Sequence, residues 1–232
     1  TTLAGTVRLY RDGTQKASGA SPQSEIVLLG AGSYAYKVNA TGNANYSDNS
    51  TGVTYYAPVN AAQSTCYLTV APPTPITYGT PSTAVCICTN PETTGNLYRN
   101  GTLANNENNT GTVMPAGTWQ YTCNVSQTQD YTSATNSTTY VVNQGAVGID
   151  LWLNNAKNSD NSIKYPASAN ATAMMNITGV SFTLLRNGTA VGTQIGPRTE
   201  YDDLLGAGTY NFTAYFAGNQ NYTAFTATNT LT

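Results

Sequence analysis

The sequence predicts an all-β protein of tandem two-sheet sandwiches, and three observations support this fold class. A set of short motifs returns three times with one internal spacing, aromatic and apolar residues alternate in steps of two, and turn dipeptides separate these runs. No window has the 3.6-residue apolar period of an amphipathic helix. The 232 residues therefore divide into a few small units.

The repeat is defined by an arginine motif, an Ala-Gly motif and a closing tyrosine motif. The arginine motifs are Leu9–Thr14, Leu97–Thr102 and Leu184–Thr189. The Gly of the second motif precedes the Tyr of the third by 14 residues in every copy, in the pairs Gly32 and Tyr46, Gly117 and Tyr131, and Gly208 and Tyr222. A fixed period means one structural unit used repeatedly. We predict domains at residues 1–62, 63–145 and 146–232.

The second copy shows the expected strands in order. They are an edge strand at 66–70 that continues after the prolines of 71–75 at 76–78, then 83–88, 95–99, a short strand after the turn, 110–114, 118–125 and 135–142. Thr, Tyr and Val dominate these runs and favour a pleated surface. About seven short strands per unit predict tandem immunoglobulin-like β-sandwich domains.

Turn and strand details support this interpretation. Asp12-Gly13, Asn100-Gly101 and Asn187-Gly188 are tight-turn dipeptides that tolerate positive φ, so each arginine strand leads into a hairpin. Tyr121 lies two residues before Cys123, as in a tyrosine corner. The third strand lacks the Trp of antibody domains, which favours a general immunoglobulin-like sandwich.

The combined motifs resemble the tandem immunoglobulin-like repeats of archaeal cell-surface proteins. The residues that carry the resemblance are Ile76–Thr80, Leu97–Thr102, Ala116–Asn124 and Asp130–Thr132, with partial matches in the other copies. The resemblance covers nearly the whole chain. It implies an extracellular structural or adhesive role and no chemistry.

The first unit is expected to lack its opening strands. Tyr78 and Tyr165 each precede the arginine of their unit by 21 residues, and the equivalent of this Tyr would lie about ten residues before Thr1. We expect either that the chain is an excerpt of a longer array, which we favour, or that a neighbouring molecule donates the missing strands.

The composition limits the partners. Charged residues are 9% of the chain and the net charge is −2, which argues against nucleic acid or an anionic membrane as the main partner. No run approaches the roughly 20 apolar residues of a membrane span, so we predict no membrane insertion in this segment. The polar surface must instead come from 39 Thr, 15 Ser and 26 Asn.

Twelve Asn-X-Ser/Thr sequons predict N-glycosylation in an extracellular setting, whereas chance in so Asn-rich a chain would give about six. They are Asn39, Asn45, Asn49, Asn100, Asn108, Asn124, Asn136, Asn170, Asn176, Asn187, Asn211 and Asn221. Strand alternation points Asn39, Asn124 and Asn211 outward, opposite the inward aromatic series, and Asn100 and Asn187 lie at hairpin tips. We expect these five to carry glycans.

Four cysteines lie in the second unit, at Cys66, Cys86, Cys88 and Cys123, and predict two disulfides. Zinc is disfavoured because the chain has no His and the Cys86-X-Cys88 spacing is wrong. Of the possible pairings we favour Cys88–Cys123 between the sheets with Cys66–Cys86 along the edge. The swapped pairing, Cys66–Cys88 with Cys86–Cys123, is the close rival.

The sequence predicts no enzyme, cofactor or metal site. The absence of His removes the commonest general base. Asp202-Asp203 with Glu200, or the segment Asn158–Asn161, could hold Ca²⁺, but solvated loops are the favoured interpretation. Arginines 11, 99 and 186 could form a ligand row, although a role at the sandwich edge is favoured.

We predict a structural segment of an extracellular, N-glycosylated surface filament or S-layer-like coat that self-associates into a polymer. Linkers at 57–64 and 143–147 would join the sandwiches of this array. The alternative is a cell-surface adhesin or carbohydrate-binding module, with specificity in loops such as the insert at 157–164.

Overall fold

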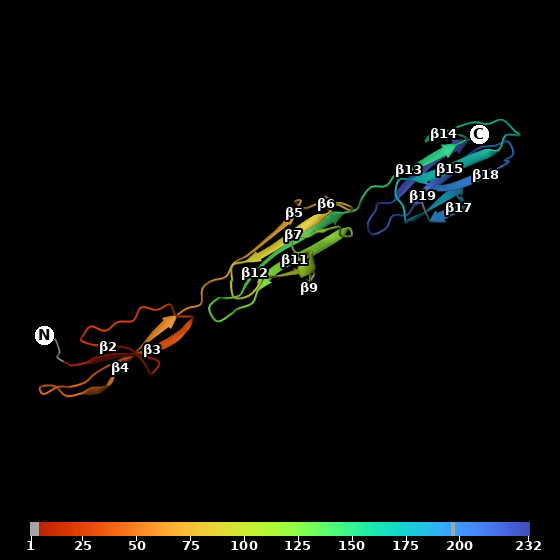
Figure 1. Ribbon diagram of the computed structural model, residues 1–232. Coiled ribbons are helices and arrows are strands. Elements are labelled where there is room, and N and C mark those ends of the chain that lie inside the picture. The colour runs from red at the N-terminus through yellow and green to blue at the C-terminus, as the bar shows by residue number, and fades with distance from the viewer. Residues whose placement is uncertain (1–4, 196–197) are drawn as a thin grey trace. The chain divides into compact units, whose positions relative to one another are not determined.

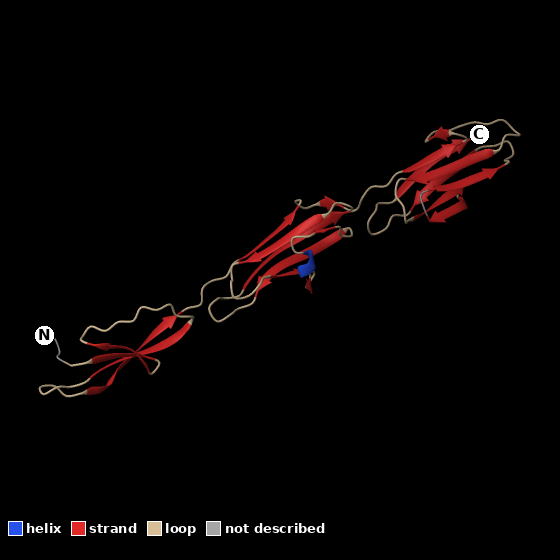
Figure 2. Cartoon of the chain, viewed as in Figure 1, coloured by secondary structure: helices blue, strands red, loops and turns tan. Residues whose placement is uncertain are grey.

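The computed structural model describes residues 5–195 and 198–232, and nearly all of its regular structure is β-strand (Figures 1 and 2). The predicted all-β fold class with tandem immunoglobulin-like sandwiches is confirmed. The chain forms two compact units, which are Thr1–Thr69 with Val85–Asn108 and Tyr121–Thr138, and Val70–Ala84 with Asn109–Gln120 and Thr139–Thr232. This division passes through the second repeat, so the three predicted domain boundaries stay a prediction.

The third repeat is a complete two-sheet sandwich. Its sheets have the strand orders β14-β13-β15-β18 and β17-β16-β19-β20. The strands are β13 (Ile149–Leu153), β14 (Ala156–Lys157), β15 (Ala169–Met175), β16 (Ser181–Arg186), β17 (Thr189–Ile195), β18 (Arg198–Asp203), β19 (Tyr210–Phe216) and β20 (Phe225–Leu231). Alternate residues of both sheets point inward, so that Leu151, Leu184 and Phe212 are completely buried in one core.

The second repeat has the same plan, with sheets β10-β7-β5 and β6-β12-β11-β8-β9. Its elements are β5 (Cys66–Ala71), β6 (Ile76–Thr77), β7 (Ser82–Cys88), β8 (Asn96–Arg99), β9 (Thr102–Leu103), the short 3₁₀ helix η1 (Asn105–Glu107), β10 (Gly111–Thr112), β11 (Gly117–Val125) and β12 (Ala134–Asn143). These bounds lie within about two residues of most predicted strands, which is the usual uncertainty at element ends.

The proline tract moves the chain from one sheet to the other. β5 pairs in the first sheet and ends at Ala71, whereas Ile76 in β6 lies parallel to Val142 in the second. The carbonyl of Pro72 accepts a hydrogen bond from the Tyr140 hydroxyl at 2.8 Å. Because proline has no N–H to offer a central ladder, it suits an edge segment that changes partners.

The first repeat forms a single sheet in the described part of the chain, with the order β2-β1-β3-β4. Its strands are β1 (Val7–Arg11), β2 (Thr14–Gly19), β3 (Gly32–Ala40) and β4 (Asn49–Val59). Val38 lies opposite Leu9 and Val53, yet Val38 is 45% and Val53 61% exposed. The equivalent of Val38 in the third repeat is Ala214, which is buried beneath a second sheet. The series Tyr34, Tyr36 and Val38 thus shares one face of β3, but Tyr36 is half-buried and Val38 exposed, whereas their counterparts Phe212 and Ala214 are buried.

The hairpin turns have the predicted conformation. Asp12, Asn100 and Asn187 have φ of 51°, 49° and 50°, and the glycine that follows each has φ between 77° and 80°. Two successive positive φ values match the twist of the flanking strands, and glycine reaches them at no steric cost.

We expect Phe212→Ala to lower the free energy of unfolding of the third repeat by about 3–5 kcal/mol, because it empties the centre of this core. Tyr215→Ala on the same strand is the control, since that side chain is 44% exposed and its loss should cost far less. Urea unfolding curves compare them, and equal shifts of the midpoint would contradict the assigned strand parity.

Candidate functional site

The three repeated arginines each pair with a carboxylate of their own repeat. Arg11 lies 3.3 Å from Glu25, Arg99 3.0 Å from Glu107, and Arg186 3.8 Å from Asp203. Each pair joins the arginine strand to a segment that follows later in the repeat. This geometry supports the favoured structural role of the arginines over a ligand-binding row.

A tyrosine hydroxyl joins each ion pair. Tyr36 donates to Glu25 at 3.1 Å, and Tyr121, at the equivalent position, donates to Glu107 at 3.5 Å. The third repeat has Phe212 at this position, and Tyr201 supplies the hydroxyl by donating to Asp203 at 2.9 Å. The rings of Tyr201 and Phe212 pack with centroids 5.6 Å apart. The third repeat therefore also has a tyrosine hydroxyl at its ion pair, but the hydroxyl comes from β18 and not from β19, which carries Phe212.

Burial raises the pKa of both Tyr121 and Tyr201 in these clusters. The main cause for Tyr121 is desolvation, followed by the nearby Glu107 carboxylate, and for Tyr201 it is desolvation with the hydrogen bond to Asp203. A neutral phenol is thereby favoured in the folded protein.

All four cysteines form disulfides, but the favoured pairing was wrong and the rival pairing is present. Cys66 bonds to Cys88 with their Cα atoms 4.1 Å apart, and Cys86 bonds to Cys123 with their Cα atoms 5.4 Å apart. The first bond joins β5 to β7 within one sheet, and the second joins β7 to β11 across the two sheets.

Strand register explains the correction. Thr89 donates its N–H to the Thr65 carbonyl at 2.9 Å, and this antiparallel pair places the neighbouring Cys66 and Cys88 opposite each other. Cys86 then follows the buried parity of β7 and faces Cys123. The sulfurs of Cys88 and Cys123 are still only 3.6 Å apart.

Three of the candidate calcium ligands, Asp203, Asp160 and Asn158, have protein partners. Asp203 holds Arg186 and Tyr201, Asp202 is exposed, and the side chain of Glu200 lies outside the described residues. In the other segment, Asp160 accepts from the Thr230 N–H at 2.7 Å and Asn158 accepts from the Leu151 N–H at 2.8 Å. The sulfurs of Cys66, Cys88 and Cys123 lie within 4.8 Å of one another, but each belongs to a disulfide.

None of the twelve sequon asparagines is buried, although they differ in their surroundings. Asn100, Asn187 and Asn211 are exposed as expected, whereas Asn39 and Asn124 are half-buried. Asn108 is also half-buried, and its side-chain amide pairs with both the N–H and the carbonyl of Cys86, at 2.9 and 3.2 Å. Modification of these residues stays a prediction.

Two recurring segments form a backbone-recognition site that the sequence reasoning missed. We call residues 30–32, 115–117 and 206–208 the Ala-Gly turns, and residues 42–47, 127–132 and 218–223 the tyrosine loops. In each turn an aromatic side chain donates to the carbonyl four residues earlier, from Tyr34 to Gly30, from Trp119 to Pro115 and from Tyr210 to Gly206, at 2.8, 3.1 and 2.9 Å. All three turns thus share one internal hydrogen bond.

Within the first compact unit, the tyrosine loop of the second repeat binds an Ala-Gly turn. The Asp130 carboxylate accepts from the Ala31 N–H at 2.5 Å, and the Gln129 amide donates to the Ala31 carbonyl at 3.3 Å. A Cβ on Gly30 would lie 2.7 Å from the Asp130 carboxylate, so glycine permits this close approach.

The same contacts occur within the second compact unit. The Asn221 side chain accepts from the Ala116 N–H at 3.0 Å, and Gln220 donates to the Ala116 carbonyl at 3.3 Å. The rings of Tyr78 and Tyr222 meet edge to face at a centroid distance of 5.2 Å. The loop therefore forms hydrogen bonds with both the N–H and the carbonyl of one alanine. This recognition needs no charged side chain on the turn.

Comparisons with known proteins identify no family. No family model and no curated protein matches the sequence. Among solved structures, the Clostridium thermocellum CbhA fibronectin(III)-like modules are 14% identical with a TM-score of 0.27, over 71% of this chain and 93% of that one. The I9-I11 tandem from titin is 13% identical with a TM-score of 0.30, over 100% and 89%.

A third similar structure is Bacteroides ovatus SGBP-B of the mixed-linkage glucan utilization locus, in complex with a mixed-linkage heptasaccharide. It is 16% identical with a TM-score of 0.21, over 99% of this chain and 60% of that one. Likenesses this weak carry no argument about the function of this chain. Within the described residues, no helix is long and apolar enough to cross a membrane.

Replacing Cys86 and Cys123 together by alanine should lower the free energy of unfolding by about 3–4 kcal/mol, because the bond closes a loop of 37 residues. The third repeat has buried Ala173 and Ala214 at these positions, so the double variant should still fold. Chemical unfolding of the oxidised proteins measures the difference. A non-reducing peptide map of the wild type that joined Cys88 to Cys123 would contradict the pairing.

Tyr121→Phe should destabilise the fold by about 1 kcal/mol at neutral pH, through loss of the hydrogen bond to Glu107. The raised pKa of Tyr121 means that the unfolded chain loses the phenol proton first, so the wild type loses stability as pH rises above about 10. Tyr121→Phe has no phenol proton to lose at this position, so the difference in free energy of unfolding between wild type and variant should shrink at alkaline pH. Urea unfolding measures this difference. A constant deficit would contradict the raised pKa.

Proposed function

We propose that this chain is a structural segment of an extracellular, N-glycosylated surface filament or coat. The observation that carries the proposal is the repeated contact between a tyrosine loop and an Ala-Gly turn, at Asp130 with Ala31 and again at Asn221 with Ala116. A sandwich array whose successive repeats bind through one recurring contact is suited to extension by repetition.

The disulfides support an oxidising compartment. Two disulfides in one small sandwich are typical of secreted and surface proteins and rare in the cytosol of mesophiles. They also join three strands of two sheets, which would help such a segment to keep its fold outside the cell.

N-glycans would supply the hydration that the 9% of charged residues cannot. The exposed sequons at Asn49, Asn100, Asn187 and Asn211 leave room for a sugar. We expect Asn108 to stay unmodified, because both ends of its amide already complete the edge of β7. The surface would then be neutral and covered by sugar.

Glycopeptide mass spectrometry of the native protein should find sugars at Asn100, Asn187 and Asn211, because these side chains are exposed, and none at Asn108. Electron microscopy of the same material should show regular polymer. The rival function, a cell-surface adhesin or carbohydrate-binding module, predicts instead a monomer that binds glycan arrays. Unmodified peptides at all three exposed sequons would overturn the proposed extracellular coat.

A further inference from the structure

We propose that the four cysteines of the second repeat form a thiol–disulfide exchange site. An external dithiol opens the Cys66–Cys88 bond, and Cys88 then attacks Cys123 in the other bond. The inference goes beyond the proposed function and does not depend on it. It follows from the packing of the two disulfides against each other beside an open hollow.

The two disulfides touch through one sulfur of each. The Sγ atoms of Cys88 and Cys123 lie 3.6 Å apart although each belongs to a different bond, and the sulfurs of Cys66, Cys88 and Cys123 all lie within 4.8 Å of one another. Exchange begins when a thiolate attacks one sulfur of a disulfide. Once Cys88 is a thiolate, the sulfur that it attacks is therefore already in contact with it.

The four sulfurs differ in their access to solvent. Cys66 and Cys86 are each 5% exposed and Cys123 is completely buried, whereas Cys88 is half-buried. Cys88 lines a hollow with a cavity volume of about 520 Å³, whose wall includes the loop of residues 90–95. An external thiol therefore reaches the Cys66–Cys88 bond far more readily than the Cys86–Cys123 bond.

The loop beside Cys88 is held by hydrogen bonds and approaches the sulfur closely. The Asn90 side chain donates to the Ser126 carbonyl and to the Thr128 hydroxyl, both at 3.3 Å. A Cβ on Gly95 would lie only 2.8 Å from the Cys88 Sγ, so glycine leaves the space that this sulfur occupies. The surroundings of the Cys88 sulfur are thus fixed by the fold.

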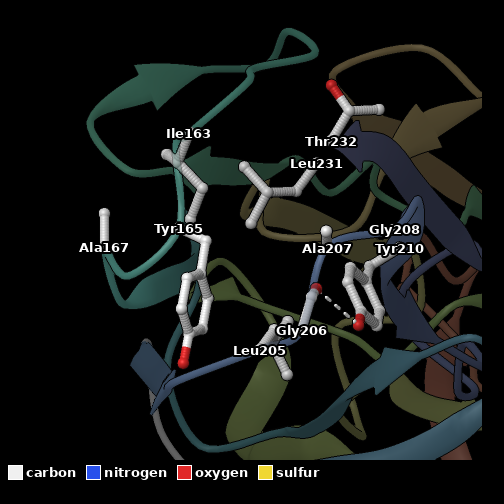
Figure 3. A pocket seen from close by; sticks show the side chains of 10 residues that line it. All are labelled: Ile163, Tyr165, Ala167, Leu205, Gly206, Ala207, Gly208, Tyr210, Leu231 and Thr232. Carbon is white, nitrogen blue, oxygen red and sulfur yellow. Dashed lines mark hydrogen bonds between the residues drawn. The ribbon is translucent and has the colours of Figure 1, made fainter.

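The third repeat shows that a sandwich of this kind folds without these sulfurs. Met175 lies opposite Ile149 at the positions of Cys88 and Cys66, and both side chains are buried. A hollow of that repeat, with a cavity volume of about 100 Å³, is lined mostly by apolar and aromatic side chains and by no cysteine (Figure 3). The exchange site is therefore specific to the second repeat, which carries all four cysteines.

The first step is reduction of the edge bond. One sulfur of a dithiol bonds to Cys88, the bond between Cys88 and Cys66 breaks, and Cys66 leaves as a thiolate. The second sulfur of the dithiol then displaces Cys88. The dithiol has given two electrons and becomes a cyclic disulfide, and its two protons go to Cys66 and Cys88.

The second step is exchange inside the protein. The Cys88 thiolate bonds to the Cys123 sulfur, the bond between Cys123 and Cys86 breaks, and Cys86 leaves as a thiolate that takes up the proton released by Cys88. No further oxidant or reductant is needed, because one disulfide replaces another. The connection between the sheets moves by two residues along β7, and electrons supplied at the edge reach a bond that is itself buried.

The first test treats the oxidised full chain with less than one equivalent of dithiothreitol. Acid quenching and alkylation of free thiols precede a non-reducing peptide map, in which tandem mass spectrometry distinguishes Cys86 from Cys88. We expect a Cys88–Cys123 bond with alkylated Cys66 and Cys86, a product that the untreated chain lacks. Absence of this product at every ratio of dithiol to protein would overturn the proposal.

A matched pair of double variants tests the route by its rate. Cys66→Ile with Cys88→Met introduces the residues of the third repeat and removes the point of entry. Dithiothreitol should then open the remaining bond at least about tenfold more slowly than in the wild type, because buried sulfurs are reached only when the fold opens. Cys86→Ala with Cys123→Ala is the control, and its edge bond should open at the wild-type rate.

The direction of the change separates exchange from structural support alone. Loss of a disulfide that only stabilises the fold would make the remaining bond open faster. Unchanged or faster reduction of the Cys86–Cys123 bond in the first variant would therefore contradict the route through Cys88. Neither measurement involves glycans or polymer, so failure of the exchange leaves the proposed function standing.

Discussion

Every backbone N–H and carbonyl that leaves a sheet needs a hydrogen-bond partner, and in this protein asparagine side chains often supply it. Asn108 binds both polar groups of Cys86, beyond the short stretch where β10 pairs with β7, and Asn158 accepts from Leu151 beside β13. Asn187 accepts from a strand N–H next to its hairpin. An amide can donate and accept at once, so it mimics a peptide group. This explains how a chain with few charged residues satisfies the backbone groups at its sheet ends.

The repeat, the strands and the turn conformations could be predicted from sequence because each depends on local pattern. Positive φ at Asp12 follows from Asp-Gly alone, and the buried side of β19 follows from alternation. The disulfide pairing could not, because Cys86 and Cys88 share one parity and only the strand register beside them distinguishes the two. The contact between Asp130 and Ala31 joins residues 99 apart. The constant 14-residue spacing from turn to loop was the one sequence signal that could have indicated it.

The first repeat shares some local features with the other two repeats but differs from the third in the burial of its apolar face. Its sheet has the hairpin turn and the arginine ion pair, here Arg11 with Glu25, that the other repeats also have, and both depend on residues close in the sequence. Its apolar face, with Val53 and Tyr55 61% and 70% exposed, lacks the area buried in the third repeat's core. In the described residues, the side chains of Val53 and Tyr55 therefore contribute little buried apolar area.

The tyrosine loops of the second and third repeats have contacts that the loop of the first repeat lacks within the described residues, where Ala44 stands at the position of Gln129 and Gln220. The glutamine of each bound loop adds a hydrogen bond that Ala44 cannot make, and these loops are further braced because Ala62 and Gly145 pair with their backbone. Each of the two contacts inside the chain therefore combines side-chain recognition of an alanine with backbone pairing of the loop that carries it.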